Sequence, residues 1–313
     1  VGFHRVIAYP TAPDGADHGS GGAILAVGLG HAGLKAMQLL AISDLHLSHP
    51  VNRAALLDIP DHGDDWLIIA GDVAERLDHQ ELAFQELGRR FAKLIWVPGN
   101  HDLWTVPRGG ETPLRGDARY QVLVELARAY GAVTPEDPFL EWPRAGPDGS
   151  RILIVPLFLL YDYSFRPAEI ERAKVRRWAR EQGAVCSDEV WLHPDPFPSR
   201  QAWCWARCQE AERRLATLPK DCRTILVNHW PMRADLIRIP RIPRFTPWCG
   251  TVLTDDWHRR FQAVAVVTGH LHTRRTDVVD ECRFEEVSLG YPRQWQWDGG
   301  IDSYFRVILG NGG

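Results

Sequence analysis

The 313-residue sequence lacks the features that mark several common protein classes. Its six cysteines include no CxxC pair, which argues against a zinc knuckle or a disulfide framework and suits a reducing cytoplasm. No apolar run reaches about 18 residues, so the chain is not expected to cross a membrane. Positive charge is not in excess: 36 Lys and Arg stand against 40 Asp and Glu, and the net charge of -4 argues against broad electrostatic binding of nucleic acid.

Five short polar blocks each follow an apolar run of the kind that forms a buried strand. The runs are Leu39–Ile42, Leu67–Ala70, Leu94–Val97, Ile225–Val227 and Val264–Val267. The blocks are Asp44-Leu45-His46, Gly71-Asp72, Gly99-Asn100-His101-Asp102, Asn228-His229 and Gly269-His270-Leu271-His272. In open α/β folds, side chains just past the strand ends converge on one rim of the sheet. Because carboxylate, imidazole and amide groups suit borderline and hard divalent metals, the pattern predicts a two-metal centre on that rim.

Helices and further strands are predicted between and after these blocks. The expected helices are Asp78–Phe91, Asp117–Tyr130, Glu169–Gln182 and Ser199–Leu218, and the expected strands are Arg151–Leu160, Phe284–Ser288 and Tyr304–Ile308. We expect these three strands to belong to a second sheet. The last two helices lie between the third and fourth polar blocks, where a helical insertion around residues 165–220 is large enough to shape a substrate pocket.

Residues 37–313 are expected to form a single domain, because a cut between residues 44 and 272 would split the predicted centre. Residues 1–36 are expected to be an N-terminal extension that is either dispensable or the product of a misassigned start site. Met37 leads directly into the first predicted strand. The mildly apolar stretch Gly21–Ala36 has no basic segment before it, as a signal peptide would require.

In order and content the five blocks resemble the calcineurin-like metallophosphoesterase superfamily, whose motifs run D-x-H, GD, GNHD, H and GHxH. The resemblance covers roughly residues 38–290 and implies an αββα sandwich, with two mixed β-sheets flanked by helices and a dimetal site at the loops after the strand C-termini. It implies that Asp44, His46, Asp72 and His272 hold one metal ion, and that Asp72, Asn100, His229 and His270 hold the other, with Asp72 bridging. Such ions lie about 3.5–4 Å apart. Mn and Fe suit these mixed ligands best, and Zn is also compatible.

Two residues of the third block are implied in catalysis rather than in metal binding. By this resemblance, His101 either stabilises charge on the phosphoryl group or protonates the leaving oxygen. Asp102 either orients His101 or, as a turn-capping residue, holds the loop. The sequence leaves both roles of Asp102 open.

Segments outside the metal motifs resemble a bacterial subfamily of phosphopantetheinyl hydrolases within this superfamily. They are Pro98–Trp104, Phe158–Phe165, Trp248–Thr251 and Val287–Pro292. The resemblance implies that the substrate is a holo acyl or peptidyl carrier protein, whose serine-linked 4′-phosphopantetheine is removed by hydrolysis to leave the apo carrier protein. One alternative is a phosphodiesterase or phosphatase acting on a small nucleotide, cyclic or not, or on another phosphoester. Another is a non-catalytic protein that keeps its metals to hold its fold, although the complete ligand set argues against it.

Four arginines and one aspartate occur in residues 233–244, just after His229. They suit the acidic surface expected of a carrier protein, with Arg238 and Arg241 as candidate contacts, or they form a solvated loop whose arginines pair internally. Trp104 and Trp230 directly follow ligand-bearing loops and are candidate substrate contacts, although such residues more often pack in the core. The sequence leaves the oligomeric state open.

Overall fold

The computed structural model describes residues 37–107, 114–146, 148–296 and 299–310, all within one compact unit. Residues 1–36, for which the sequence predicts an extension, lie outside the described residues. Among the described residues, no helix combines the length and the apolar character needed to cross a bilayer.

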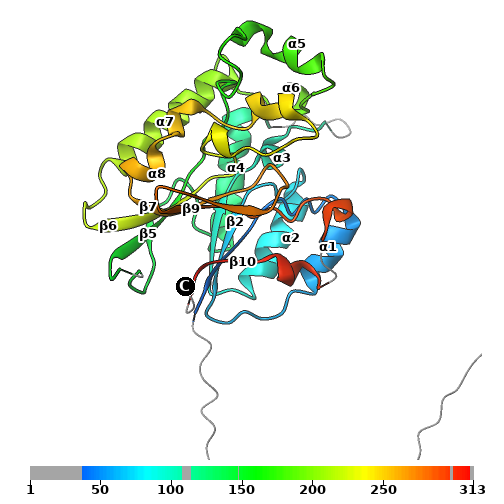
Figure 1. The fold of residues 1–313 in the computed structure, drawn as a ribbon. Coiled ribbons are helices and arrows are strands. Elements are labelled where there is room, and N and C mark those ends of the chain that lie inside the picture. The colour runs from blue at the N-terminus through cyan, green and yellow to red at the C-terminus, as the bar shows by residue number, and fades with distance from the viewer. Residues whose placement is uncertain (1–36, 108–113, 147, 297–298, 311–313) are drawn as a thin grey trace, which may run out of the picture. The chain divides into compact units, whose positions relative to one another are not determined.

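The described strands form two mixed sheets (Figure 1). The first has four strands in the order β10-β1-β2-β3, and the second has six in the order β4-β5-β6-β7-β9-β8. In the first sheet β1 (Leu39–Ile42), β2 (Trp66–Ala70) and β3 (Lys93–Val97) are parallel, and β10 (Arg306–Leu309) is antiparallel to β1. The parallel strands of the second sheet are β5 (Arg151–Pro156), β6 (Cys222–Val227), β7 (Ala263–Thr268) and β9 (Cys282–Glu286). Its edges are the antiparallel strands β4 (Leu140–Glu141) and β8 (Arg275–Val279).

The sheets pack face to face because alternate side chains of a strand point to opposite faces. In β1, Leu39 and Ala41 belong to a buried cluster that also contains Ile152 and Ile154 of β5, so this cluster is the core between the sheets. The intervening residues of β1 belong instead to a larger cluster that includes residues of the helices, such as Phe84. Each central strand is therefore buried on both faces, which explains why the runs are apolar throughout.

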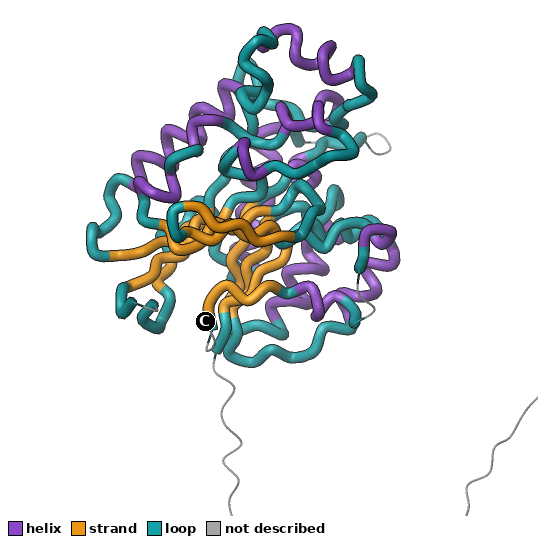
Figure 2. Tube along the Cα trace, in the orientation of Figure 1, coloured by secondary structure: helices purple, strands orange, loops and turns teal. Residues whose placement is uncertain are grey.

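Helices cover the outer faces of the sheets, and Figure 2 shows the strands lying between helical layers. The α-helices are α1 (Pro50–Leu57), α2 (Leu77–Gly88), α3 (Asn100–Leu103), α4 (Gly116–Ala129), α5 (Val175–Arg180), α6 (Asp188–Trp191), α7 (Arg200–Leu215) and α8 (Trp257–Arg260). Short 3-10 helices are η1 (Arg172–Lys174), η2 (Ala234–Leu236), η3 (Pro243–Trp248), η4 (Val252–Thr254), η5 (Pro292–Gln294) and η6 (Ile301–Tyr304). The predicted α/β class, with two mixed sheets flanked by helices, is confirmed.

Three of the predicted elements differ from the structure. The segment Tyr304–Ile308 does not complete the second sheet: β10 pairs with β1 in the first sheet, a non-local pairing that local sequence pattern does not specify. The strand expected over Arg151–Leu160 ends at Pro156, and the apolar residues after it are buried in an irregular segment. Of the helix expected over Glu169–Gln182, only η1 and α5 form, because the segment buries only two of its apolar side chains, Val175 and Ala179.

Candidate metal centre

The seven predicted metal ligands come together at the C-terminal ends of the strands. Asp44 and His46 follow β1, Asp72 follows β2, Asn100 follows β3, His229 follows β6, and His270 and His272 follow β7. The ends of the two sheets are joined here by an isolated bridge between Ser43 and Ser288. The rim of one sheet thus meets the rim of the other, and both contribute predicted ligands.

The ligand-bearing loops are held in a backbone conformation that is unfavourable for residues with a Cβ atom. Asp44, His46, Asp72, His270 and His272 have φ angles of 54°, 44°, 55°, 72° and 53°. Left-handed backbone at non-glycine residues is uncommon and costs on the order of 1–3 kcal/mol each. Five of the seven predicted ligands adopt this conformation, which indicates that the fold tolerates backbone strain in order to aim these side chains.

In the first ligand set, two imidazoles and a carboxylate converge on one point. Nε2 of His272 lies 2.9 Å from Oδ1 of Asp44 and 3.1 Å from Nε2 of His46. Burial, together with the charge that His101 and His272 can carry, holds the pKa of His46 well below its ordinary value, so its ring is neutral. Two imidazole nitrogens that face each other beside a carboxylate are a suitable ligand set for a cation.

The second set brings acceptor atoms face to face. Nδ1 of His229 donates to the carbonyl of Ala70 at 2.9 Å, and burial lowers the pKa of His229 to about 4. In this neutral ring Nε2 therefore carries a lone pair, and it points at Oδ1 of Asn100 only 3.1 Å away. Nδ1 of His270 lies 3.1 Å from the same oxygen. Two facing acceptors repel each other unless a cation lies between them, so these residues fit a metal ion.

Asp72 lies between the two sets. Its Oδ1 is 3.5 Å from Nε2 of His229, and its Oδ2 is 4.0 Å from Nε2 of His46. Burial and the neighbouring carboxylates of Asp44 and Asp102 raise the pKa of Asp72 well above its ordinary value. The centre thus has more negative charge than its surroundings balance, which a bound cation would relieve.

Two motif positions require glycine because predicted ligands lie too close to the backbone there for any side chain to fit. A Cβ atom on Gly99 would lie 2.1 Å from Oδ1 of Asp72, and one on Gly71 would lie 2.6 Å from Nδ1 of His229. Gly71 also has a φ angle of +87°. Side chains at these two positions would displace the ligands themselves.

Hydrogen bonds from outside the motifs orient the ligands. Oδ2 of Asp44 accepts hydrogen bonds from the hydroxyls of Ser43 and Ser288, at 2.6 and 2.7 Å. Although burial opposes its charge, the His272 partner holds the pKa of Asp44 well below its ordinary value. Nδ1 of His272 lies 2.9 Å from Oε1 of Gln294. Ser288 and Gln294 lie outside the five metal motifs and were not predicted to orient ligands, although Ser288 belongs to the segment Val287–Pro292 that carries the subfamily resemblance.

His101 stands beside the two ligand sets and is held by a glutamate. Its Nε2 lies 3.9 Å from Oδ2 of Asp72, and its Nδ1 lies 2.6 Å from Oε1 of Glu75. Burial opposes ionisation of Glu75, but the His101 contact lowers its pKa to about 2. Glu75 was not predicted from the sequence, although a carboxylate three residues after a predicted ligand was a usable signal.

The structure favours the loop-holding role of Asp102. This buried carboxylate accepts hydrogen bonds from the backbone N–H groups of Asp72, Val73, Ala74 and Gly99, at 2.8–3.1 Å. Burial nevertheless raises its pKa to about 6. Asp102 therefore ties together the loops after β2 and β3, while Glu75 contacts the His101 imidazole.

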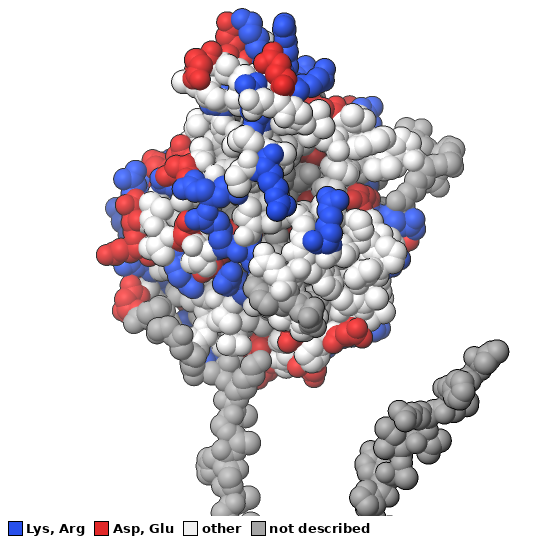
Figure 3. Space-filling model, turned by 45° about the vertical axis from the view of Figure 1, so that its right-hand side comes forward, with Lys and Arg blue, Asp and Glu red and all other residues white. Residues whose placement is uncertain are grey.

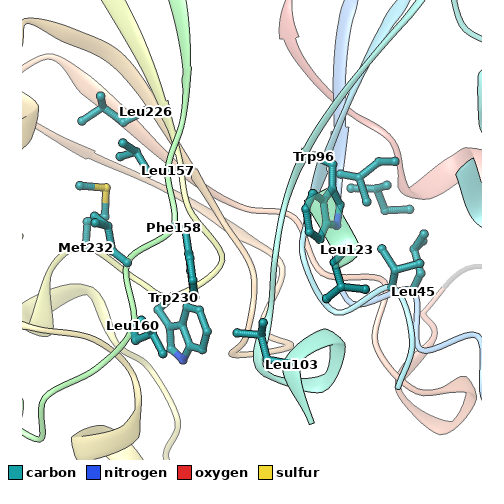
Figure 4. Close-up of a cluster of buried hydrophobic side chains, with 14 of the residues drawn as sticks. Leu45, Trp96, Leu103, Leu123, Leu157, Phe158, Leu160, Leu226, Trp230 and Met232 are labelled. Atoms are coloured by element: carbon teal, nitrogen blue, oxygen red, sulfur yellow. The ribbon is translucent and has the colours of Figure 1, made fainter. Parts of the chain in front are cut away.

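The two candidate tryptophans lie in different environments. Trp104 stacks on His101, with ring centroids 3.7 Å apart, at the edge of the centre. Trp230 is completely buried among apolar residues that include Phe158 and Leu160 (Figure 4). A substrate could reach the Trp230 indole only if that part of the core moved.

The four arginines of residues 233–244 divide into two pairs. Arg233 forms an ion pair with Asp235 at 2.8 Å, and Arg244 stacks on Trp178 at 4.7 Å, so both are held internally. Arg238 and Arg241 are exposed. Arg238 donates hydrogen bonds to the backbone carbonyls of Asp235 and Ile237, but its side chain, like that of Arg241, is exposed and accessible to a partner, as the docking hypothesis requires.

Three groups of carboxylates and imidazoles in the described part of the chain lie close enough to hold a metal ion. They are Asp44, His46 and His272; Asp44, Asp72 and His229; and His46, Glu75 and His101. The first two contain only predicted ligands. The third is a geometric alternative in which His101 would bind metal.

Comparison with known proteins agrees with this geometry. Residues 37–274 match the family of calcineurin-like phosphoesterases, and the chain therefore belongs to that family, whose members are hydrolases that use divalent metal ions. The chain is 47% identical over 260 residues to the [acyl-carrier-protein] phosphodiesterase PptH of Mycobacterium tuberculosis, covering 82% of this chain and 79% of the relative. The crystal structure of phosphopantetheinyl hydrolase (PptH) from Mycobacterium tuberculosis superimposes with a TM-score of 0.80 at 45% identity, covering 88% of this chain and 96% of that one. Both resemblances predicted from the sequence are confirmed.

Proposed function

We propose that this protein is a two-metal phosphodiesterase that releases 4′-phosphopantetheine from the serine of a holo acyl or peptidyl carrier protein. The observation that carries the proposal is the pair of ligand sets that share Asp72, with His101 beside them. The activity named for the 47% identical relative supports the choice of substrate. On this proposal Asp44, His46, Asp72 and His272 hold one ion, and Asp72, Asn100, His229 and His270 hold the other.

The reaction breaks the bond between phosphorus and the serine oxygen and forms a bond between phosphorus and a water oxygen. The bound metals would supply Lewis acidity toward the phosphoryl oxygens and lower the pKa of a water molecule. His101 would deliver a proton to the serine oxygen, which is a strongly basic leaving group. Glu75, 2.6 Å from Nδ1 of His101, would keep the opposite nitrogen aimed at the substrate and stabilise the charged ring.

The metals proposed are Mn and Fe, with Zn compatible, because the ligands are a mixture of imidazole nitrogens and carboxylate or amide oxygens. A reducing cytoplasm is the proposed location. All six cysteines are buried free thiols, which supports a compartment in which disulfides do not form.

Mass spectrometry of a holo carrier protein incubated with the enzyme and Mn²⁺ tests the proposal. We expect the carrier protein to lose the mass of the prosthetic arm, and free 4′-phosphopantetheine to appear in equal amount. The matched control is a carrier protein without the arm, whose mass should not change. Hydrolysis of a cyclic nucleotide with no change in the holo carrier protein would favour the alternative small-nucleotide function.

Reversal of Arg238 and Arg241 to Glu should raise KM for the holo carrier protein, mainly by slowing association. Figure 3 shows basic and acidic side chains mixed over one face, so a local pair of exposed arginines rather than the net charge would guide an acidic partner. The effect should shrink at high salt, since exposed charges are screened beyond about 8–10 Å. The rate of hydrolysis of a small artificial diester should hardly change, because the proposed metal ligands and His101 remain in place. Steady-state kinetics on both substrates at two salt concentrations measures these effects.

A double reversal of Arg89 and Arg213 to Glu provides a control of equal net charge. Both side chains are exposed, and they lie near the C-terminal ends of α2 and α7, away from the strand ends that carry the ligands. This control should leave KM for the carrier protein unchanged. If the small-diester rate collapses in the Arg238 and Arg241 variant, the segment is structural; if neither rate changes, the two arginines form a solvated surface.

A further inference from the structure

One side chain of the helical insertion reaches the candidate metal centre. Asp188 is the first residue of α6 and is completely buried. Its Oδ1 accepts hydrogen bonds from Nδ2 of Asn100 at 3.0 Å and from Nε1 of Trp104 at 2.6 Å. Asn100 belongs to the second ligand set, and Trp104 stacks on His101. A single oxygen of the insertion thus contacts a proposed metal ligand and the tryptophan that stacks on the proposed proton donor.

The hydrogen bond from Asn100 decides which end of its amide faces the ligands. The carbonyl oxygen of an amide can bind a metal ion, whereas its NH₂ group can only donate hydrogen bonds. Because a carboxylate accepts, the NH₂ group of Asn100 points to Asp188, and Oδ1 points to the imidazoles 3.1 Å away. Without this acceptor, a half-turn of the amide would bring the NH₂ group to the lone pair of His229, where it would occupy the place of a metal ion.

The carboxylate oxygens of Asp188 are less completely hydrogen-bonded than those of Glu189, the next residue of α6. In the described part of the chain, Oδ2 of Asp188 is buried without a hydrogen-bond partner, a state that costs folding free energy. Both oxygens of Glu189 are paired, Oε1 with the Tyr163 hydroxyl at 2.6 Å and the Trp248 indole at 2.9 Å, and Oε2 with Arg200 at 3.0 Å. Glu189 therefore ties the insertion together, whereas Asp188 is poorly suited to a purely stabilising role.

We propose that Asp188 is a positioning residue that holds Asn100 in its metal-binding orientation and Trp104 against His101. The helical insertion then supports the metal centre, although it lies far from the metal motifs in the sequence. This inference rests on the proposed function, because it takes Asn100 to be a metal ligand.

Titration of the metal-free protein with Mn²⁺ tests the inference without reference to turnover. The wild type is expected to bind two ions. In Asp188→Ala, affinity for one of them should fall by roughly 10–100-fold, as is typical when a hydrogen bond to a metal ligand is lost, while the other ion stays bound. Asp188→Asn should bind the ion held by Asn100 more tightly than Asp188→Ala does, because its amide oxygen can still accept both hydrogen bonds. If the alanine variant fails to fold, Asp188→Leu should show the same loss, since it fills the space but offers no acceptor.

Glu189→Gln is the matched control on the same helix. It should lower the unfolding temperature of the metal-free protein and leave Mn²⁺ affinity unchanged. A folded Asp188→Ala protein that binds both ions as tightly as the wild type would overturn the inference alone. So would a Glu189→Gln protein that loses as much Mn²⁺ affinity as Asp188→Ala, because the loss would then follow from a loosened α6. A wild type that binds only one ion would instead overturn the proposed two-metal centre, and this inference with it.

Discussion

Replacing Asp72 by asparagine should abolish turnover and reduce the bound metal from two ions to one or none. Asp72 is the proposed bridging ligand, with one oxygen 3.5 Å from His229 and the other 4.0 Å from His46. An amide offers one neutral oxygen where the carboxylate offers two charged ones, so the bridge between the ions is lost. Elemental analysis of metal per chain, measured beside the rate of carrier-protein hydrolysis, tests both parts of the prediction.

The loss of turnover and of bound metal in Asp72→Asn should not come from a damaged fold. Asp72 lies beside the carboxylates of Asp44 and Asp102, and removing its charge relieves their repulsion. The metal-free variant should therefore unfold at a temperature no lower than that of the metal-free wild type. Asp65→Asn is a control at the opposite end of β2, where the buried carboxylate accepts a hydrogen bond from the Gln38 N–H at 2.8 Å. It should keep both ions. Two tightly bound ions in Asp72→Asn would contradict the ligand assignment.

The central strands and the clustering of polar residues at their C-terminal ends were predictable, because both depend on short stretches of contiguous sequence. The run Leu39–Ile42 coincides with β1, and the runs Leu67–Ala70 and Leu94–Val97 each differ from β2 and β3 by one residue at the start. A short run of large apolar residues that must be buried on both faces has few alternatives to a central strand. Polar residues immediately after such strands then have to lie at a common edge, whatever the rest of the chain does.

Features that depend on distant pairing were not predictable in this way. β10 joins the first sheet because its residues fit beside β1, which precedes it by more than 200 positions. Asp188 meets Asn100 across a separation of 88 residues, and no periodicity or spacing in the sequence connects them. Glu75 is a different case: it is close to Asp72 in sequence, but only the folded loop shows that its carboxylate meets His101.

Replacing His101 by alanine should lower turnover by about 10²–10⁴ while both metal ions remain bound. That range is the usual contribution of a positioned acid or base. The loss should be larger for an alkyl diester than for a diester with a nitrophenol leaving group, which needs little protonation. Metal content and the rates on both substrates are the measurements. Loss of a metal ion would instead indicate that the group formed by His46, Glu75 and His101 binds metal.

His101 could protonate the leaving oxygen or stabilise charge on the phosphoryl oxygens, and the variant Glu75→Gln distinguishes these two roles. The amide oxygen can still accept a hydrogen bond from Nδ1 of His101, but it no longer stabilises the charged ring. We therefore expect a smaller loss than in His101→Ala, again larger for the alkyl diester than for the nitrophenyl diester. If both variants lose the same factor on both substrates, His101 does not protonate the leaving oxygen. Its contribution would then be stabilisation of the charge on the phosphoryl oxygens, which does not depend on the leaving group.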